Sequence, residues 1–444
     1  GSGLVSGIAA GSATITATSE GQSGTAAVTV AVAPVASVSV TPSTASIFVS
    51  STVQLTATLR DAAGNVLTGR PISWSSNNPG VATVNASGLA TGVAAGSAAI
   101  TATSEGQSGA GQVDVLTQNP GDTQITGISF DWSTYRKLAT GSDNWPLTWC
   151  EDGHQYTSWG DGEGFQDTGN DPGLGFARIE GATHANWSAT DLYEGPRGGG
   201  SDGGKVESML CINGILYALR SPSSNSSGFD YKEVWRSTDK GSSWSTVSGS
   251  RLVGDATGAP GLPFYINYGQ NYTANTDGYV YIYSIRIADP NNWEVQKPGV
   301  TWLARAPVAN EEFMYPANWE WVTGFNGTTP IWGTQANRTP VLEDPDGVMR
   351  SSALYLPAFD RYVMVTNHTA RNLGNIAIWE APEPWGPWTL VLKEFGWPQG
   401  GEVSPRFAFG NFSPKWLDSA GNCVFVWFRP DAWNSVACRF ATEP

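Results

Sequence analysis

The chain has 444 residues, which is enough for about three domains of ~150 residues. It carries 24 Lys and Arg against 39 Asp and Glu, a formal net charge of −15. Nucleic acids and anionic lipid surfaces require clustered cations, so this balance argues against both as partners. No apolar run approaches the ~18 residues of a membrane-spanning helix, and no membrane span is expected.

The composition favours strands over helices. Charged residues make up 14% of the chain, while glycine occurs 53 times and tryptophan 20 times. Glycine suits tight turns, and aromatic and β-branched residues favour strands, so we expect an all-β fold. Gly1–Gly11 lack the basic and apolar regions of a signal peptide. We therefore expect that a signal has been removed or that the sequence is a fragment.

No metal site or cofactor is expected. The chain contains no Cys-x-x-Cys pair, and its three histidines are scattered, so the ligand spacing of a zinc site is missing. Four cysteines in a chain of this length do not make a disulfide scaffold. Cys423 and Cys438 nevertheless flank a predicted hairpin and could pair.

The composition changes near residue 120. Residues 1–120 contain one tryptophan and no tyrosine, lysine, cysteine or histidine. Within them, Gly3–Gly24 and Gly88–Gly109 repeat nearly the same sequence at an offset of 85 residues. This period is about the size of one Ig-type sandwich. The polar segment that follows predicts a linker at residues 117–124.

One complete copy of the repeat lies between Ala36 and Val115. It reads SVSVTP, STVQLTATLRD, ISWSS, VATVN and GLATGVAAGSAAITATS, in that order. These motifs resemble the bacterial Ig-like (group 2) family. The resemblance implies a complete sandwich at residues 33–116 and the C-terminal part of another at residues 1–32. Such modules are spacers or surface adhesins without catalytic residues, which implies a bacterial extracellular or cell-surface protein.

The incomplete copy at residues 1–32 raises a question of partners. Half a sandwich leaves strand edges unpaired and an apolar face exposed, which is costly. We hypothesise that a neighbouring copy of the chain donates the missing strands, so that the chain self-associates through this part. The alternative is that the half-domain packs on the complete domain of its own chain.

Residues 125–444 predict a β-propeller. Strand–turn–strand units recur about every 50 residues, and most continue into a further strand. We count five blades, and Ile128–Trp132 (ISFDW) is placed to complete the last blade and close the ring. The five units contain, in chain order, PLTWCEDGHQYTSWGD, VESMLCINGILYALRS, PFYINYG with YVYIYSIRI, MRSSALYLPAFDRYVMVTNH, and FSPKWLDSAGNCVFVWF.

One segment indicates the fold but not a catalytic site. Ser237–Trp244 fits the Asp-box pattern S-x-D-x-G-x-x-W of sialidase-like propellers. In that pattern the aspartate and serine tie off a turn between outer strands. We therefore give Asp239 no functional role.

Candidate catalytic residues lie in the first unit, where Asp143 and Asp161 occur among tryptophans that include Trp145. Aromatic faces stack on sugars, and glycoside hydrolysis requires paired carboxylates. Both aspartates fall at strand edges where loops would enter the channel. The structural alternative is that the tryptophans form blade core, and we favour that alternative for Asp152, which lies in a hairpin turn.

Further polar residues begin or follow the predicted inner strands. An arginine at the head of an apolar strand, Arg350, requires a carboxylate partner, either a structural one between blades or a ligand. A glutamate in a glycine-rich loop, Glu402, could equally be solvated. The predicted substrate-binding residues are Trp145, Lys205, Glu207, Tyr268, Arg350 and Glu402.

The segments SDNWPLTWCEDGHQYTSWGDGEGF, GGKVESML, MRSSALYLPAFDRYVMV, IAIWEAPEPWGPW and SPKWL resemble a family of secreted bacterial five-bladed propellers without a defined general function. Some members of that family are endo-acting D-arabinan hydrolases that use acidic residues in the channel. The resemblance implies a polysaccharide or glycan as partner. By position, it implies Asp143 and Asp161 as the catalytic acids. Cys150 departs from the family, since a small or apolar residue is expected there.

Three functions remain open from the sequence. The first is a glycoside hydrolase acting through Asp143 and Asp161. The second is a polysaccharide lyase, with Tyr268 or His154 as base and Lys205 or Arg350 neutralising a uronate. The third is a non-catalytic surface or filament-forming protein, in which Ig-like domains assemble and the propeller is displayed or binds glycan.

Overall fold

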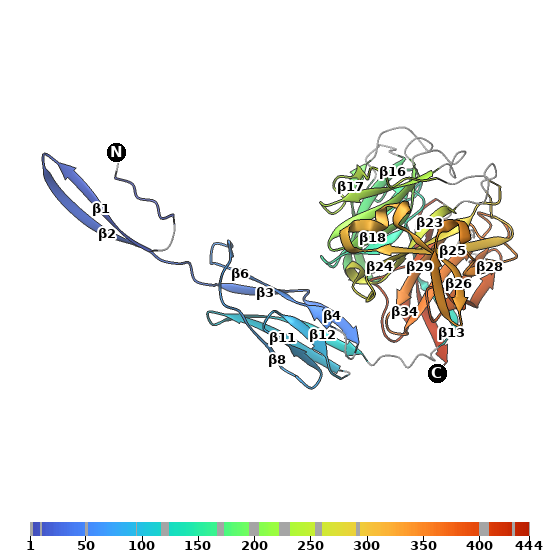
Figure 1. Cartoon of the computed structure of the whole chain (residues 1–444), viewed down its shortest axis with the longest axis horizontal. Coiled ribbons are helices and arrows are strands. Elements are labelled where there is room, and N and C mark those ends of the chain that lie inside the picture. Colours follow the sequence, from blue (N-terminus) through green and yellow to red (C-terminus); the bar gives the residue numbers. More distant parts are fainter. Residues whose placement is uncertain are drawn as a thin grey trace. The chain divides into compact units, whose positions relative to one another are not determined.

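The structure is a computed structural model of the chain, which divides into two compact units, Gly1–Gln118 and Asn119–Pro444 (Figure 1). None of the helices in the described part combines the length and apolarity that a bilayer crossing needs. The structure describes residues 3–8, 11–48, 52–94, 96–116, 124–166, 173–194, 204–221, 231–253, 260–289, 294–398, 408–428 and 431–443.

The first unit begins with a two-stranded hairpin of β1 (Gly11–Ser19) and β2 (Gln22–Val30), which pair antiparallel. Every residue of β1 is exposed, including the apolar Ile15. No described part of the chain therefore covers this strand, so the alternative in which the half-domain packs on its own complete domain is not what the described residues show.

A β-sandwich follows, and its three sheets have the strand orders β3-β6-β7, β4-β12-β11-β8 and β5-β10-β9. Alternating residues of the long β11–β12 hairpin, such as Ile100 and Val113, are fully buried in its core. The strands are β3 (Ser37–Thr41), β4 (Thr44–Phe48), β5 (Thr52–Gln54), β6 (Thr56–Arg60), β7 (Val66–Leu67), β8 (Ser73–Ser76), β9 (Ala82–Val84), β10 (Leu89–Gly92), β11 (Gly96–Ser104) and β12 (Gln107–Leu116).

The second unit is a β-propeller of five blades within the described residues (Figure 1). The first blade contains β14 (Leu147–Trp149), β15 (Gln155–Gly160), β16 (Leu174–Thr183) and β17 (Asn186–Glu194). The second contains β18 (Lys205–Ile212), β19 (Ile215–Ser221), β20 (Tyr231–Ser237), β21 (Ser245–Thr246) and β22 (Leu252–Val253).

The third and fourth blades share one sheet, because their innermost strands pair. The third contains β23 (Pro260–Asn267), β24 (Tyr279–Arg286), β25 (Gly299–Pro307), β26 (Glu320–Asn326), β27 (Thr329–Gly333) and β28 (Leu342–Asp344). The fourth contains β29 (Ser351–Leu356), β30 (Arg361–Asn367), β31 (Ile376–Ala381) and β32 (Thr389–Glu394). Four short 3₁₀ helices accompany the third blade: η2 (Gln270–Tyr272), η3 (Ala309–Met314), η4 (Pro316–Asn318) and η5 (Gln335–Asn337).

The fifth blade closes the ring. It joins β33 (Phe409–Phe412), β34 (Asn422–Phe428) and β35 (Trp433–Glu443) to β13 (Gln124–Leu138), the first strand of the propeller. Gln124 lies opposite Glu443, so the two ends of the domain meet in one strand pair. The prediction that ISFDW completes the last blade is confirmed.

The innermost strands β14, β18, β23, β29 and β33 form an inner ring. Side chains join strands of the ring: Tyr265 on β23 donates its backbone N–H to Ser208 on the neighbouring β18, and Asn267 on β23 donates to the carbonyl of Leu147 on β14. β23 and β29 pair in parallel, which shows that these inner strands run in the same direction. We call the end of the ring where the innermost strands begin the head end, and the opposite end the tail end.

The segment Ser237–Trp244 forms the turn between β20 and β21. Asp239 accepts hydrogen bonds from Ser237 Oγ at 2.8 Å and from the backbone of Ser243 at 2.9 Å. The hydrogen bonds from Ser243 lower the pKa of Asp239. These bonds occupy the carboxylate within its own turn, in agreement with a structural role.

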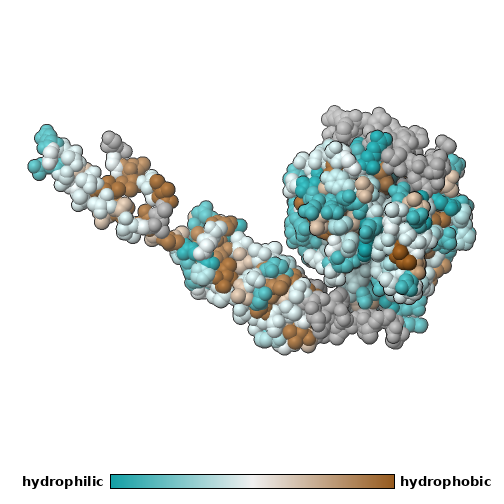
Figure 2. All heavy atoms as spheres, in the orientation of Figure 1, coloured by the Kyte–Doolittle hydropathy of each residue, from teal (hydrophilic) through white to brown (hydrophobic). Residues whose placement is uncertain are grey.

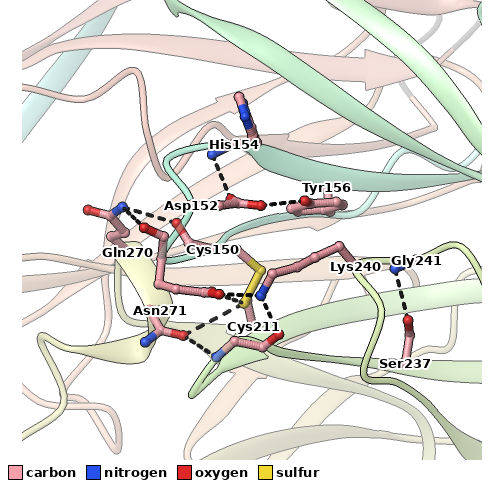
Figure 3. Close-up of polar contacts among 12 residues, drawn as sticks. Cys150, Asp152, His154, Tyr156, Cys211, Ser237, Lys240, Gly241, Gln270 and Asn271 are labelled. Carbon is pink, nitrogen blue, oxygen red and sulfur yellow. Dashed lines mark hydrogen bonds and ion pairs between the residues drawn. A yellow bond between two sulfur atoms is a disulfide. The ribbon is translucent and has the colours of Figure 1, made fainter. Parts of the chain in front are cut away.

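All four cysteines form disulfides. Cys423 and Cys438 lie opposite each other on β34 and β35, the pair that the sequence suggested. Cys150 and Cys211, which the sequence analysis did not pair, link the tail ends of the first and second blades (Figure 3). Lys240 reinforces this link, because it contacts both Glu151 and the carbonyl of Gly214.

We expect the Cys150–Cys211 disulfide to stabilise the propeller more than the Cys423–Cys438 disulfide. The two bonds join residues 61 and 15 positions apart. In the chain-entropy model, loops of these sizes correspond to about 4 and about 3 kcal/mol. Denaturant midpoints of the Cys150→Ser/Cys211→Ser and Cys423→Ser/Cys438→Ser double variants measure the difference. A larger loss in the second variant would contradict the prediction.

His184 is expected to make stability depend on pH. It lies between β16 and β17, 2.9 Å from Ser435 Oγ, and burial lowers its pKa to about 4. The unfolded state takes up a proton near pH 6.5, whereas the native state stays neutral to about pH 4. Up to about 3 kcal/mol is therefore present above pH 6.5 and lost as the pH falls toward 4. Unfolding free energies at pH 7 and 4.5 should differ less in His184→Gln; an equal difference would contradict this.

Candidate functional site

Five charged side chains gather at the head end of the inner ring. Asp143 lies just before β14, Lys205 begins β18, and Arg350 directly precedes β29. Asp161 follows β15 of the first blade, and Glu207 lies within β18. The structure thus brings together both predicted catalytic acids and three of the predicted substrate-binding residues, drawn from three different blades.

Lys205 lies between the two aspartates. Its Nζ atom is 2.9 Å from Asp143 Oδ1 and 2.8 Å from Asp161 Oδ1. The two carboxylate oxygens are therefore at most about 5.7 Å apart, the sum of these two distances. The side chains differ in exposure, at 13% for Asp143 and 34% for Asp161. One ammonium group thus holds a buried and a partly exposed carboxylate close together.

Glu207 and Arg350 form a second charged pair beside this group. Glu207 occupies a bulge in β18, where the pairing with β19 shifts between Val206 and Ser208. A bulge redirects a side chain, and here Glu207 Oε2 lies 3.9 Å from Arg350 Nε. Both side chains are buried. Arg350 has the carboxylate partner between blades that its place at the head of an apolar strand required.

The pKa of Asp143 is raised by its surroundings. Burial raises the pKa of its carboxyl group, and the charge of Asp161 raises it further. Lys205 and Arg350 act in the opposite direction. A carboxyl group whose charged form is penalised by burial can carry a proton at a higher pH than an exposed one.

The backbone around the two acids adopts uncommon conformations. Asn144, Trp145 and Asp161 have φ angles of 71°, 23° and 49°, in the left-handed region that most residues avoid. Asp143 and Gly160 pair between these residues through backbone hydrogen bonds of 2.7 and 2.8 Å. Strained residues that cluster in this way are typical of functional sites.

Gly160 is a member of the site that the sequence analysis missed. A Cβ atom there would lie 2.5 Å from Lys205 Nζ and 2.7 Å from Asp143 Oδ1. Only glycine leaves room for the Lys205–Asp143 contact. The available signal was the run Gly160–Gly164, in which glycines alternate with acidic residues.

Two further residues that sequence reasoning missed fix the loop after Asp161. Ser142 Oγ accepts the backbone N–H of Gly164 at 2.9 Å. Asp191, on the outer strand of the blade, accepts the backbone N–H groups of Phe165 and Gln166 at 3.0 and 2.8 Å. These contacts hold the loop that carries Asp161 against the blade.

Trp145 does not offer a face for a sugar. It is 1% exposed, and its ring packs against Phe165 and Trp433. The positive φ angles at Asn144 and Trp145 belong to the turn that leads into β14. Its expected substrate-binding role is therefore replaced by a core role, the structural alternative considered for the tryptophans.

Tyr268 lies on the tail side of the site. Asn267 is opposite Leu354, four residues beyond Arg350, so Tyr268 lies five residues, or about 16 Å, along the strand direction from Arg350. It is buried among other tyrosines, including Tyr362, and burial raises its pKa well above 10. Its expected role in substrate binding is not supported by this position.

Neither residue expected to act as the base of a lyase lies at the site. Tyr268 is buried away from Lys205, and its raised pKa opposes deprotonation. His154 lies in the turn beside the Cys150–Cys211 disulfide at the tail end (Figure 3). Neither side chain accompanies the cations that would neutralise a uronate.

Two other expectations concern residues outside this cluster. Glu402 lies outside the described residues. Among those described, Cys150, Glu151 and Cys211 offer ligand atoms within 4.8 Å of one another. The two sulfurs are joined in a disulfide, so neither is available as a thiolate for a metal ion.

The sandwich can be compared with known families. Residues 34–115 match the family model described as Bacterial Ig-like domain (group 2). This confirms the Ig-like resemblance. A curated protein is also similar to part of the chain: 129 residues are 44% identical to Ice-binding protein 1 of Shewanella frigidimarina. The match covers 29% of this chain and 14% of that protein's length.

Solved structures of low sequence identity resemble the chain. An exo-β-1,3-galactanase of Phanerochaete chrysosporium, solved with β-1,3-galactotriose, is 13% identical (TM-score 0.39; 71% of this chain, 63% of that one). A family 117 glycoside hydrolase of Zobellia galactanivorans is 11% identical (0.38; 72% and 92%). An α-L-arabinofuranosidase of Podospora anserina, in complex with cellotriose, is 10% identical (0.37; 72% and 96%). Identities of this size and TM-scores below 0.5 assign no chemistry to the present chain.

Proposed function

We propose that the propeller is a glycoside hydrolase that cleaves a polysaccharide at the head end of its inner ring. The observation that carries this proposal is the pair of carboxylates held by Lys205 within about 5.7 Å. Retaining glycosidases place their carboxyl groups ~5 Å apart, whereas inverting enzymes require ~6.5–9.5 Å. The spacing therefore favours retention of configuration.

The two acids differ in the way that the two roles require. Asp143 is the general acid, because burial favours its protonated form. Asp161 is more exposed and stays in contact with Lys205 when Asp143 carries the proton. It acts as the nucleophile. Glu207 and Arg350 lie beside them and bind hydroxyl groups of the sugar.

The location of the protein follows from two other features. Disulfides persist in oxidising compartments, and all four cysteines are paired. Together with the Ig-like domain, they indicate an extracellular or cell-surface protein. A polysaccharide is an accessible substrate there.

Incubation of the chain with purified polysaccharides tests the proposal. D-arabinan comes first, because the resemblance of the propeller segments implies it, followed by L-arabinan, β-1,3-galactan and xylan. We expect new reducing ends from one of them, and NMR of the first product should show the anomer of the substrate. The absence of new reducing ends across the panel, or an inverted product, would contradict the proposal.

A non-catalytic glycan-binding function is the second candidate. The observation that favours it is that Lys205 contacts both carboxylates, so that each is occupied by a cation. A saturable binding isotherm for one of these polysaccharides, without any release of reducing ends, would support binding over hydrolysis.

A further inference from the structure

The β1–β2 hairpin is a second copy of the β11–β12 hairpin. Gly11 pairs with Val30 and Ser19 with Gln22, and at the offset of 85 residues Gly96 pairs with Val115 and Ser104 with Gln107. The registers are identical over nine residue pairs. The two hairpins therefore place equivalent positions on corresponding faces, and fifteen of the twenty side chains are identical.

The two copies differ in what covers them. Ile100 in β11 is 0% exposed, whereas its equivalent Ile15 in β1 is 40% exposed. Val113 is likewise 0% exposed, and its equivalent Val28 is only half-buried. Figure 2 shows apolar surface on the N-terminal part of the chain. The first hairpin thus has the apolar face that packs in the core of a sandwich, but no described strands pack on it.

Gly88 and its equivalent Gly3 differ in what lies beside them. Gly88 has a φ of +83°, and a Cβ atom there would meet the Trp74 ring at 2.8 Å and the Leu55 carbonyl at 2.5 Å. Its equivalent Gly3 has a φ of +70°, and nothing lies within 4 Å of the same point. The backbone already has the conformation that accommodates the tryptophan, and the tryptophan is absent.

A second glycine gives the same result at the other end of the hairpin. A Cβ atom at Gly109 would lie 2.3 Å from the carbonyl of Val38, in β3. At its equivalent, Gly24, nothing lies within 4 Å. At this position the hairpin therefore leaves room for a strand like β3. Ala26 stands where the second hairpin has Gly111, and a Cβ atom at Gly111 would lie 2.8 Å from the carbonyl of Pro42, so a bound strand set would have to shift at that point.

The strands that cover β11 and β12 identify what would pair along the first hairpin. β8 pairs antiparallel with β11, and β4 pairs parallel with β12. In addition, Glu105 in the β11–β12 turn accepts the backbone N–H of Val35 at 2.9 Å and a hydrogen bond from Arg70 at 2.8 Å. Glu20 occupies the corresponding turn position of the first hairpin, with nearly the same φ.

We propose that the β1–β2 hairpin is a docking site for a strand set of the Ig-like kind, equivalent to residues 34–85, carried by a polypeptide segment other than residues 1–444. The bound set would pair a strand like β8 with β1 and a strand like β4 with β2, place a tryptophan on Gly3 and present an arginine to Glu20. The inference does not depend on the activity of the propeller.

A second copy of this chain is not the donor of the strand set, because each chain has two such hairpins and only one strand set to cover them. Each chain carries two hairpins of this type, β1–β2 and β11–β12, and one strand set, residues 34–85, that already covers the second. Exchange of strand sets between copies frees one hairpin for each one that it covers. Self-association by strand donation, the hypothesis from the sequence, therefore leaves the number of uncovered hairpins unchanged.

A chain extended by a copy of residues 34–85 directly before Gly1 tests the proposal. In this order Gly1 takes the place of Ala86, so that the added strands stand before the first hairpin as the resident set stands before the second. We expect hydrogen exchange at residues 11–30 to slow by at least about 100-fold, toward that of residues 96–115. In an Ile15→Cys variant, thiol labelling should slow when the strand set is added.

Matched variants make either outcome informative. Ile15→Asp in the extended chain places a charge where Ile100 is buried, and it should restore fast exchange at residues 11–30 without changing residues 96–115. Unchanged exchange at residues 11–30 and unchanged labelling in the extended chain would overturn the proposal. Concentration-dependent protection of the hairpin in the original chain, with a dimeric mass, would overturn it in favour of a second copy.

Discussion

Replacement of Asp143 by Asn is expected to lower the rate of polysaccharide cleavage by at least about 100-fold, because a positioned general acid contributes ~10²–10⁴. Replacement of Asp161 by Asn should cost at least as much, since it removes the nucleophile. Asn is close to Asp in size, so both variants should melt near the temperature of the original chain. Initial rates of reducing-end release, measured beside thermal unfolding, test this expectation.

Asp152→Asn serves as the matched control. Asp152 lies in the hairpin turn at the tail end, where it accepts hydrogen bonds from the His154 backbone and the Tyr156 hydroxyl (Figure 3). Its replacement should leave the cleavage rate unchanged. Full activity in both Asp143→Asn and Asp161→Asn would remove these residues from the mechanism.

The second large effect is expected from Gly160→Ala. The added methyl group would overlap Lys205 Nζ and Asp143 Oδ1, so these buried side chains must shift to admit it. Displacement of Lys205 would separate the two carboxylates. A misplacement of about 1 Å at a reacting centre costs about 100-fold in rate, and overpacking costs about 1–3 kcal/mol in stability.

Gly127→Ala is the control for this variant. Gly127 lies on β13 of the same propeller, and a Cβ atom there would meet only the Ala441 side chain, at an ordinary 3.7 Å. We expect the kcat and the melting temperature of Gly127→Ala to match those of the original chain. Equal activity in Gly160→Ala and Gly127→Ala would show that the Lys205–Asp143 contact does not matter for turnover.

Much of this arrangement could be predicted from the sequence. Strand–turn–strand units that recur about every 50 residues located the blades, and the place of ISFDW before the first blade predicted the closing strand. The candidate residues were chosen because they lie at the edges or beginnings of predicted strands. In the structure the inner strands run in the same direction, which brings their first residues to one end. Asp143, Lys205 and Arg350 meet for that reason.

Features that depend on a single backbone angle or on pairing between blades could not be predicted in this way. Trp145 was expected beside a sugar, but the turn at Asn144 directs it into the core. Tyr268 was expected in the channel, although it follows its inner strand where Asp143 precedes one. Cys150 and Cys211 were not paired, because their contact joins two blades.

The closing strand pair joins the first and the last propeller strands to be synthesised, which has a consequence for folding during synthesis. β13 leaves the ribosome first among the propeller strands, and its partner β35 leaves last, roughly 300 residues later. At 5–20 residues per second, the edge of β13 waits about 15–60 s for the strand that covers it. Until then both edges of β13 lack a strand partner, whereas the folded sheet leaves only one edge unpaired, and unpaired edges promote aggregation. A product truncated before β35 lacks the strand that pairs with β13 and keeps both edges of β13 unpaired.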